Sequence, residues 1–600
     1  MNETTVATLL RRAELHPERV AIRALVSGGA ERDASITWAE WAAAARAFGT
    51  SLVAAGHREG DRVAILAGNR AIWPIADLGT LLAGGISVGI YPTSSPQQVA
   101  HVIADSGAVV AIVDGADQLA KLLSVRPGLP GLREIVCLEA AGAGVVSWAD
   151  WLQNGVADHA SHAAREMEAR AARLHPGSDA LLIYTSGSTG EPKGARVSHG
   201  YLTASAASIG AVLGLTEQDS SLSFLPFCHA AERVFGLHTR IVYGMTTGLV
   251  LNHERLWPAA RDFGPTIFGG VPRFFEKVWE EIERERRNAA PAERKGWDRV
   301  MELGRRRSEM KRAGLAVPEE LEREWAEASA DATRRLRDHF GGRVRLATSG
   351  GATFPDHVAE DLDALGLTVL GAYGLTEHLC VAFNRPDRYT FDSAGPPVPG
   401  TEIRLAEDGE ILIRRSALTF SGYHDRPEET AAVFSPDGEW LHTGDLGTLA
   451  SDGLLRVTGR KKELIALSTG KKVAPLAIEA QLGRHPWIDR AVVIGEGRKY
   501  LSAIITLRCA TVTGWAASRE LDLSYTELLT HPDVLSEVQK AVDTANEAFS
   551  RPERVRRFVL LEHVFTVEAE ELTPTLKVRR GRVAERYRDE LNALYMNPEP

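Results

Sequence analysis

Hydrophobic residues in the first 175 positions follow two alternating patterns. Short β-branched runs predict buried strands, at residues 62–66, 86–90, 108–113 and 134–138. Helical periodicity separates them, at residues 38–55 (ended by Gly56), 73–82 and 96–105, the last behind Ser94 and Ser95 as candidate caps. Strands separated by helices of this length predict an α/β fold, with parallel or mixed sheets covered by helices on both faces.

Another apolar run, residues 180–184, leads into a stretch of hydroxyls and glycines that ends at Lys193, before a helix predicted from Ser198. Glycines let backbone N–H groups wrap an anion, hydroxyls add donors, and a lysine suits phosphate oxygens. This predicts a phosphate-binding loop, formed by Thr185, Ser186, Gly187, Ser188, Thr189, Gly190 and Lys193. Pro192 and Gly194 flank the lysine, so the Walker A pattern is not met. A flexible surface turn is the alternative.

Composition narrows the class of protein. The chain has 600 residues, 44% of them hydrophobic and 25% charged, and predicts a multidomain globular protein. A net charge of −10 argues against nucleic-acid binding. No apolar run is long enough to span a membrane, and the N-terminus lacks the features of a signal peptide. The four cysteines lie far apart, so neither a disulfide framework nor a zinc site is predicted, and a cytoplasmic location is expected.

Three later segments join strand patterns to polar turns. Residues 343–352 run into Gly350, Gly351 and Ala352, where glycines permit close approach of a flat ring. Residues 368–377 place Tyr373, Gly374, Thr376 and Glu377 together, which offers an aromatic face, a hydroxyl and a hard oxygen ligand for Mg²⁺. Residues 440–447 contain Asp445 after a glycine, suited either to ribose hydroxyls or to an Asx-turn.

These motifs, in this order, resemble those of the adenylate-forming superfamily, which includes acyl-CoA synthetases, luciferases and peptide-synthetase adenylation domains. The resemblance covers roughly residues 10–590. It implies that Gly350–Ala352 and Tyr373 meet adenine, that Asp445 and Arg460 bind the nucleotide, and that Thr185 and Glu377 hold Mg²⁺.

The long-chain acyl-CoA synthetase branch resembles this chain at further points. Residues 224–234 match its Leu-Pro-x-x-His-x-x-Glu-Arg signature, which makes His229 a candidate catalytic residue where the acid pocket meets the thiol tunnel. A packed, satisfied histidine is the alternative. Residues 269–278 match a second signature, and a charged helical insertion is expected at about 276–340, facing solvent.

The resemblance also implies two domains, at residues 1–461 and 462–600, with Lys462 as the hinge. The smaller domain is expected to be α+β and mobile. It carries a loop at residues 469–475 that enters the site during thioester formation, and Lys577, a candidate catalytic lysine. A solvated charge is the alternative for Lys577.

The implied reaction is ATP-dependent ligation of a fatty acid, of the long-chain class, to coenzyme A through an acyl adenylate, with Mg²⁺ as cofactor. Transfer of the acyl group to a carrier protein or an amine, and a non-catalytic nucleotide-binding relative, stay open as alternatives. Acid length, a homodimer and peripheral membrane contact are not decided by the sequence.

Overall fold

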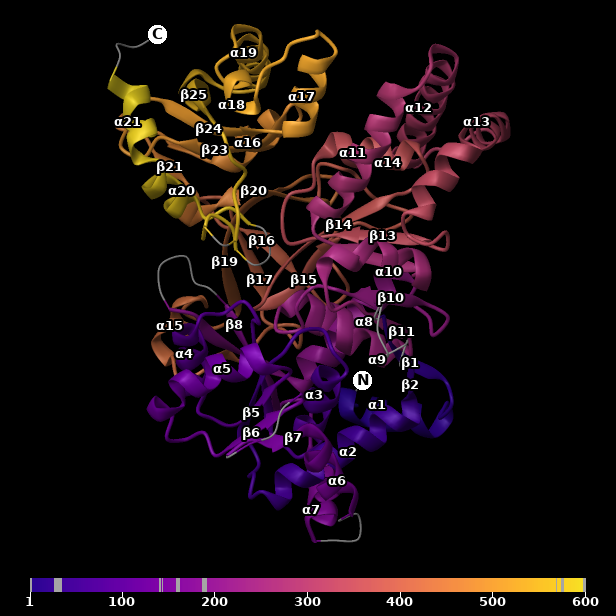
Figure 1. Cartoon of the computed structure of the whole chain (residues 1–600), viewed down its shortest axis with the longest axis vertical. Coiled ribbons are helices and arrows are strands. Elements are labelled where there is room, and N and C mark those ends of the chain that lie inside the picture. The colour runs from indigo at the N-terminus through magenta and orange to yellow at the C-terminus, as the bar shows by residue number, and fades with distance from the viewer. Residues whose placement is uncertain are drawn as a thin grey trace.

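The structure is a computed structural model that describes residues 3–25, 35–139, 142, 144–157, 162–185, 191–567, 569–573 and 577–596. Figure 1 shows the whole chain, with the C-terminal part, residues 465–596, beside the end of the molecule that carries helices α11 and α14. All structural statements below concern these residues.

The first sheet has eight strands in the order β18-β9-β8-β4-β3-β5-β6-β7. They are β3 (Arg62–Leu66), β4 (Ile86–Ile90), β5 (Ala108–Val113), β6 (Glu134–Cys137), β7 (Val146–Ser147), β8 (Asp179–Thr185), β9 (Lys193–Ser198) and β18 (Gly422–Tyr423). The strands from β8 to β7 run parallel, as expected from the sequence. The helices of this region are α2 (Trp38–Ala54), α3 (Ile72–Leu82), α4 (Pro96–Ser106), α5 (Ala116–Val125), η1 (Arg126–Gly128), α6 (Trp148–Ala157) and α7 (His162–Arg173).

The second sheet also has eight strands, in the order β15-β14-β13-β12-β10-β11-β1-β2. They are β1 (Val20–Ala24), β2 (Ser35–Thr37), β10 (Ser220–Ser223), β11 (Thr246–Leu249), β12 (Ile267–Gly270), β13 (Leu346–Ser349), β14 (Val369–Leu375) and β15 (His378–Phe383). Only its edge strands β2 and β15 pair antiparallel. Its helices are α1 (Thr5–Leu15), α8 (His199–Leu213), η2 (Ala231–His238), α9 (Thr239–Tyr243), η3 (His253–Arg255), α10 (Leu256–Phe263) and α14 (Asp356–Ala364).

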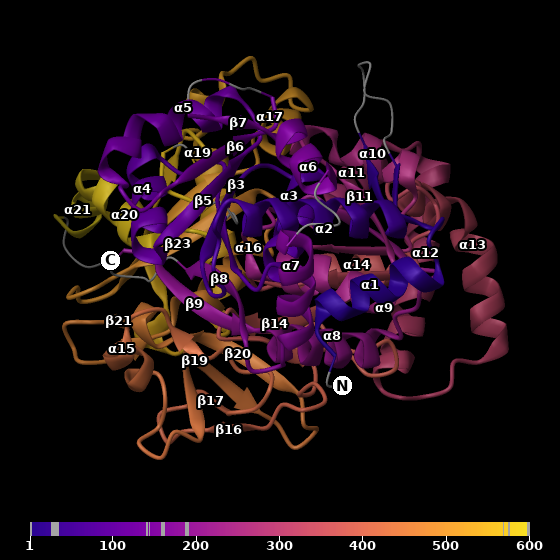
Figure 2. The same ribbon diagram turned by 90° about the horizontal axis from the view of Figure 1, so that it is seen from below.

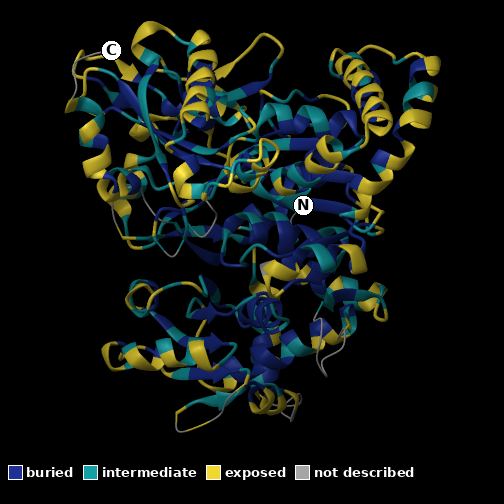
Figure 3. Ribbon diagram, turned by 45° about the horizontal axis from the view of Figure 1, so that its top comes forward, coloured by how far each residue is buried: buried dark blue, intermediate teal, exposed yellow. Residues whose placement is uncertain are grey.

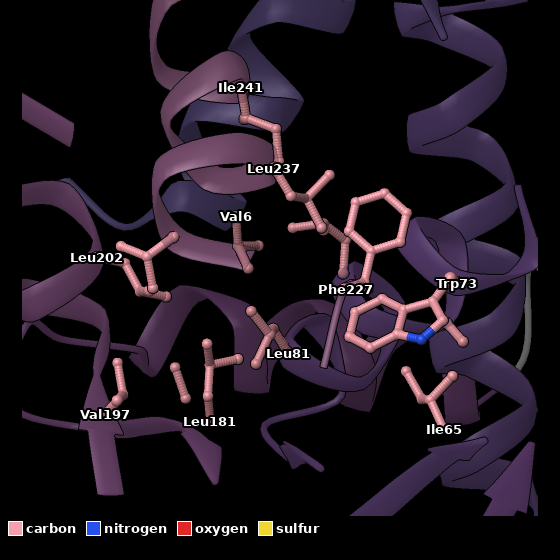
Figure 4. Packing of buried hydrophobic residues seen from close by; sticks show 14 of the residues in the cluster. Val6, Ile65, Trp73, Leu81, Leu181, Val197, Leu202, Phe227, Leu237 and Ile241 are labelled. Atoms are coloured by element: carbon pink, nitrogen blue, oxygen red, sulfur yellow. The ribbon is translucent and has the colours of Figure 1, made fainter. Parts of the chain in front are cut away.

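The largest hydrophobic core joins the two sheets. Every residue of α3 is buried, as expected for a mostly apolar helix packed between layers. Figure 4 shows Trp73 of α3 facing Phe227, and their ring centroids are 5.1 Å apart. Phe227 lies two residues before His229, so this core fixes the segment that carries the candidate histidine.

The predicted insertion is helical, with α11 (Pro272–Asn288), α12 (Pro291–Arg312) and α13 (Glu319–Asp338). It is only partly solvent-facing. Trp297, Val300 and Met301 are buried against the second sheet and α14, in a core that includes Phe340 and Leu362. The outward faces of α12 and α13 are exposed, as Figure 3 shows. Ion pairs join them there, such as Arg299 with Glu324 at 2.7 Å.

In sequence, a four-stranded antiparallel sheet lies between these layers and the C-terminal part. Its strands are β16 (Ile403–Leu405), β17 (Glu410–Arg414), β19 (Trp440–Leu449) and β20 (Leu455–Arg460). Figure 2 shows this sheet at the lower edge of the molecule, next to helix α15 (Pro427–Ala432). Strand β20 ends at Arg460, and the short helix η4 (Lys461–Glu463) follows at once.

The C-terminal part has a three-stranded sheet, β23-β24-β25, a two-stranded sheet, β21-β22, and a separate hydrophobic core between Ile465 and Val555. Its strands are β21 (Ile465–Ala466), β22 (Lys472–Val473), β23 (Ile488–Ile494), β24 (Leu501–Leu507) and β25 (Val555–Leu561). Its helices are α16 (Pro475–Gly483), α17 (Cys509–Ala517), α18 (Tyr525–Leu528), α19 (Pro532–Glu547), η5 (Arg551–Glu553), α20 (Arg580–Arg586) and α21 (Arg588–Met596). The α/β class with a smaller α+β part is confirmed.

One local expectation was incomplete. The sequence predicted a strand, a loop and then a helix around Lys193, but a second strand, β9, begins at Lys193 and pairs antiparallel with β8 before α8 starts. Half of the residues of β9 are buried, and the strand pairs with β8 along its length, so the chain returns beside β8 before it turns into the helix. Thr185 and Lys193 therefore lie at the adjoining ends of two antiparallel strands.

Within the described residues, no helix combines the length and the apolar character that crossing a bilayer requires.

Candidate active site

The two ends of the predicted phosphate loop lie side by side. Thr185 is the last residue of β8 and Lys193 the first of β9, and the two residues pair across the hairpin. Ser186, Gly187, Ser188, Thr189 and Gly190 lie outside the described residues. The Lys193 ammonium is paired with the Glu429 carboxylate of α15 and lies 5.7 Å from the ring centroid of Tyr423.

The turn that carries Glu377 connects β14 to β15 and is held from two sides. The Tyr201 hydroxyl of α8 donates to the Thr376 carbonyl (3.0 Å) and accepts from the Leu379 N–H (2.8 Å). The Tyr423 hydroxyl donates to the Glu377 carboxylate (2.5 Å).

Gly374 is required for the close packing of this turn, because a Cβ there would lie 1.5 Å from the Leu379 carbonyl oxygen. The turn is therefore rigid, and the Glu377 carboxylate is oriented by a neighbouring hydroxyl.

The predicted adenine and ribose residues lie after β13 and within β14 and β19. Gly350, Gly351 and Ala352 follow β13, and Gly351 has φ of +83°, a left-handed conformation that favours glycine. The Tyr373 hydroxyl donates to Asp445 (2.6 Å), and the other oxygen of this carboxylate pairs with Arg460 Nε (3.0 Å). Asp445 thus has specific partners here, in contrast to the Asx-turn alternative.

Lys577 comes from the C-terminal part, and its charge interacts with those of Arg460 and Asp445. Its pKa is lowered by burial and by the charge of Arg460, while Asp445 and Glu463 oppose the shift. The same lysine affects His229. Burial lowers the pKa of His229 to about 4, and the charge of Lys577 adds to this shift. The structure therefore brings Lys577, Asp445, Arg460 and His229 into one electrostatic neighbourhood, and Lys577 is not simply a solvated charge.

The protonation of His229 follows from its hydrogen bond. Its Nδ1 accepts the Ala231 N–H (3.2 Å), and with a pKa of about 4 the ring is neutral near pH 7. A neutral imidazole that accepts at Nδ1 carries its proton on Nε2, so His229 presents an N–H donor there.

Buried ion pairs that the sequence reasoning did not assign hold the His229 segment. Arg233 pairs with Asp77 and lies 4.5 Å from the ring centroid of Trp73, with both charged groups fully buried. Burial acts to raise the pKa of Asp77, but Arg233 and His238 outweigh it and lower that pKa to about 2.

Glu232, beside Arg233, receives a hydrogen bond from Ser223 (2.5 Å) and pairs with Arg240 (3.1 Å). The Glu-Arg of the signature is therefore structural, and its unusual burial in a π-helix is not readable from sequence spacing.

The residues around the proposed metal position fit Mg²⁺ in part. Glu377 supplies a carboxylate and Thr185 a hydroxyl, and no group of three or more His, Cys, Asp or Glu side chains in the described chain is arranged to hold a metal ion. Mg²⁺ is bound through one or two carboxylates together with waters and substrate phosphates, so this donor set suits an ion that arrives with ATP.

The residue before the expected hinge is anchored. Lys461 Nζ lies 2.7 Å from both Asp408 and Glu410, while Glu410 also accepts from the Gly444 N–H (2.9 Å), next to Asp445. Lys462 itself lies in η4 and is exposed. The chain is thus held on one side of Lys462, directly beside the part of β19 that carries Asp445.

Two ion pairs, away from Lys462 in the sequence, join α11 to the C-terminal part. Arg273 pairs with Asp489 (2.9 Å) and Glu280 with Arg508 (3.0 Å). These contacts join α11 to the C-terminal part in the orientation in which the charges of Lys577 and Asp445 interact.

The chain belongs to the family of AMP-binding enzymes, which matches residues 9–424, and the C-terminal domain of AMP-binding enzymes matches residues 462–599. It is 35% identical to the long-chain-fatty-acid–CoA ligase FadD15 of Mycobacterium tuberculosis, over 93% of this chain and 92% of that protein. It is 28% identical to the long-chain-fatty-acid–CoA ligase heimdall of Drosophila melanogaster, over 94% and 90%.

Among solved structures, the fold is similar to that of the anthranilate CoA ligase AuaEII in complex with anthranoyl-AMP, with a TM-score of 0.75 and 22% identity over 99% of this chain and 98% of the other. A fatty acyl CoA synthetase of Mycobacterium tuberculosis has a TM-score of 0.64 and 20% identity, over 98% and 99%. These likenesses establish the adenylate-forming fold of the chain.

Proposed function

We propose that this enzyme joins a fatty acid, of the long-chain class, to coenzyme A in two steps. ATP and the acid first give an acyl adenylate and pyrophosphate, and coenzyme A then displaces AMP. Support for acyl-CoA ligation comes from family membership and from relatives named long-chain-fatty-acid–CoA ligases that match more than 90% of the chain.

The observation that carries the proposal is the approach of Lys577 to Asp445, Arg460 and His229. A carboxylate and the α-phosphate of ATP are both anions, so joining them requires positive charge where they meet. Lys577 supplies an ammonium there. The Tyr373 hydroxyl donates to the Asp445 carboxylate and so orients it at the place proposed for ribose, and a nucleotide bound there would have its α-phosphate within reach of the lysine.

Mg²⁺, held by Glu377 and Thr185, would neutralise phosphate charge as pyrophosphate leaves. Lys193 and the backbone of the phosphate loop serve the departing β- and γ-phosphates. His229 is proposed to donate its Nε2–H to an oxygen of the acyl group. A neutral histidine can do so without repelling Lys577.

The second step requires a different arrangement of the C-terminal part. Residues 469–475 belong to that part, as does Lys577, and both are proposed to act at the same acyl carbonyl. We propose domains at residues 1–461 and 462–600 that alternate by rotation about Lys462, as hinge residues absorb large changes of φ and ψ. The orientation described here suits the first step.

A panel of acids with ATP, with AMP release compared with and without coenzyme A, tests the function. Acids of the palmitate class are expected to give the fastest release, and only with coenzyme A present. Faster turnover of acetate or benzoate would overturn the chain-length proposal. Stimulation by a carrier protein or an amine, and not by coenzyme A, would instead indicate the other acceptors. No acid-dependent release at all would indicate a nucleotide-binding relative without activity.

A further inference from the structure

The segment of residues 420–430, which the sequence motifs above leave without a role, joins the two sides of the proposed phosphate site. Its backbone hydrogen-bonds to the hairpin, from Ser421 N–H to the Arg196 carbonyl (2.9 Å) and from His424 N–H to the Gly194 carbonyl (2.8 Å). The Phe420 N–H also donates to the Glu377 carbonyl (2.9 Å). This segment, hereafter the bridging segment, therefore connects the strand that begins at Lys193 with the turn that carries Glu377.

Tyr423 makes the same connection with its side chain. Its hydroxyl donates to the Glu377 carboxylate (2.5 Å), and the Lys193 ammonium lies 5.7 Å from its ring centroid. A cation within about 6 Å of an aromatic centroid is attracted by the negative face of the ring. One side chain thus contacts the proposed metal ligand with its polar end and the phosphate-loop lysine with its ring.

The position of Tyr423 is fixed independently of these two partners. Its ring packs edge-on against Phe420 with centroids 5.0 Å apart, and its N–H donates to the Thr430 hydroxyl (2.9 Å). The Tyr423 hydroxyl is thus held in place to donate to the Glu377 carboxylate, which carries no donor of its own when ionised.

A hydrogen bond of this kind restricts the rotation of a carboxylate and leaves it able to bind a cation. One oxygen accepts from Tyr423, which leaves the second oxygen and the remaining lone pairs for a cation. Outer partners of metal ligands orient them in the same way, and their loss typically costs about 10- to 100-fold in metal affinity or activity.

We propose that Tyr423 is a positioning residue for metal-bound ATP. It holds the Glu377 carboxylate in the orientation that binds the metal ion, and it holds the Lys193 ammonium above its ring. The metal ion and the ammonium would then contact the same phosphates. This inference rests on the proposed function, because it takes Glu377 and Lys193 as the metal and phosphate groups.

The test separates the hydroxyl from the ring. Tyr423→Phe keeps the packing on Phe420 and the ring beneath Lys193, and it removes only the donor to Glu377. Binding of Mn²⁺ to the enzyme at fixed ATP, followed by electron paramagnetic resonance and corrected for Mn²⁺ bound to free ATP, is expected to weaken about tenfold. The concentration of Mg²⁺ that half-saturates pyrophosphate exchange is expected to rise by the same factor, with the KM for the acid unchanged.

Tyr389→Phe is the matched control. Its hydroxyl also donates to a carboxylate, that of Asp363 (3.1 Å), but in the loop after β15 and against α14, away from the phosphate loop. This variant is expected to bind Mn²⁺ as the wild type does. Tyr423→Leu removes hydroxyl and ring together, and is expected to raise the KM for ATP beyond the value for Tyr423→Phe.

Equal Mn²⁺ affinity in Tyr423→Phe, Tyr389→Phe and the wild type would overturn the inference. A wild-type enzyme that binds Mn²⁺ with ATP yet shows no exchange with any acid would contradict the proposed function instead. In that case the binding comparison between the two variants still decides the role of Tyr423.

Discussion

Lys193 and Lys577 reach the proposed nucleotide site from different parts of the molecule. Lys193 begins a strand of the first sheet, and its ammonium is paired directly with the Glu429 carboxylate beside the ring of Tyr423. Lys577 follows β25 in the C-terminal part and has its pKa lowered by burial and by Arg460. One lysine is built into the large α/β layers, whereas the other reaches the site only because the C-terminal part is docked.

The difference lies in what each lysine is attached to. Lys577 is anchored within the C-terminal part: its carbonyl accepts from the Thr573 N–H (2.8 Å), and the nearby buried Glu571 carboxylate accepts from the Tyr587 hydroxyl (2.6 Å). A rotation about Lys462 would therefore move Lys577 as part of a rigid unit and leave Lys193 in place. From this we expect Lys577 to serve the first step alone and Lys193 to serve ATP binding in every orientation.

The largest expected effect is that of Lys577→Ala on the first step. Adenylate formation, followed by pyrophosphate exchange, should fall about 10²- to 10³-fold, as when one preorganised donor to a developing charge is removed. Thioester formation from supplied acyl adenylate should stay near the wild-type rate. Equal losses in both half-reactions would show that the two lysines do not differ in this way.

Lys462→Pro should produce the opposite pattern. Proline fixes φ near −65° and so restricts the proposed pivot, while the docked orientation is already formed. Thioester formation should slow about tenfold, equivalent to about 1.4 kcal/mol of barrier, with pyrophosphate exchange retained. Lys462→Ala, which leaves φ free, is the control. If proline and alanine behave alike, Lys462 is not the hinge.

Lys193→Ala should weaken the use of ATP, and this effect should not depend on the orientation of the C-terminal part. The KM for ATP in the first half-reaction should rise about tenfold, in line with the loss of a charge-assisted hydrogen bond of about 1.5–3 kcal/mol. Lys540→Ala is the control, since Lys540 also pairs with a glutamate, Glu537 at 3.1 Å, on the outer helix α19. An unchanged KM in Lys193→Ala would remove this lysine from the phosphate site.

The smallest effect is a shift in pH dependence. Because burial and Arg460 lower the pKa of Lys577 from the ordinary 10.5, its ammonium is lost at a lower pH than that of a free lysine. The kcat/KM for ATP, which reports the free enzyme, should therefore decline on the alkaline side below pH 10.5. Lys577→Arg should move this decline to higher pH. A decline at the same pH in both enzymes would assign it to another group.

Much of the fold could be predicted from the sequence, because its strands and helices carry strong periodic patterns. Strands β3, β4 and β5 begin and end where their apolar runs do, and α4 begins at Pro96 behind the Ser95 cap. Strand β9 was missed, because residues 193–198 alternate small, polar and basic side chains and pair at the edge of the sheet beside β18. One of its two partners, β18, lies more than 200 residues away in the sequence.

The candidate site was predictable where a motif places several groups within a few residues, as around Tyr373 and Glu377. The residues that support the site could not be predicted. Tyr201, Tyr423 and Asp77 act through partners far away in sequence, and nothing in their local pattern indicates those contacts. The run Gly-Tyr-His-Asp-Arg-Pro-Glu-Glu-Thr from Gly422 was the available signal, since an aromatic residue beside clustered charges at a turn suggests a site.

The central claim is that the docked orientation performs the first step and must be left for the second. Arg273 and Asp489 pair across the contact, so cysteines at both positions, in a Cys509→Ser background that removes the exposed native thiol, can be joined by a short bismaleimide. Each single-cysteine variant treated with the reagent is the control. The cross-linked enzyme is expected to retain pyrophosphate exchange and to lose thioester formation from supplied acyl adenylate. Full thioester formation in the cross-linked enzyme would contradict the account.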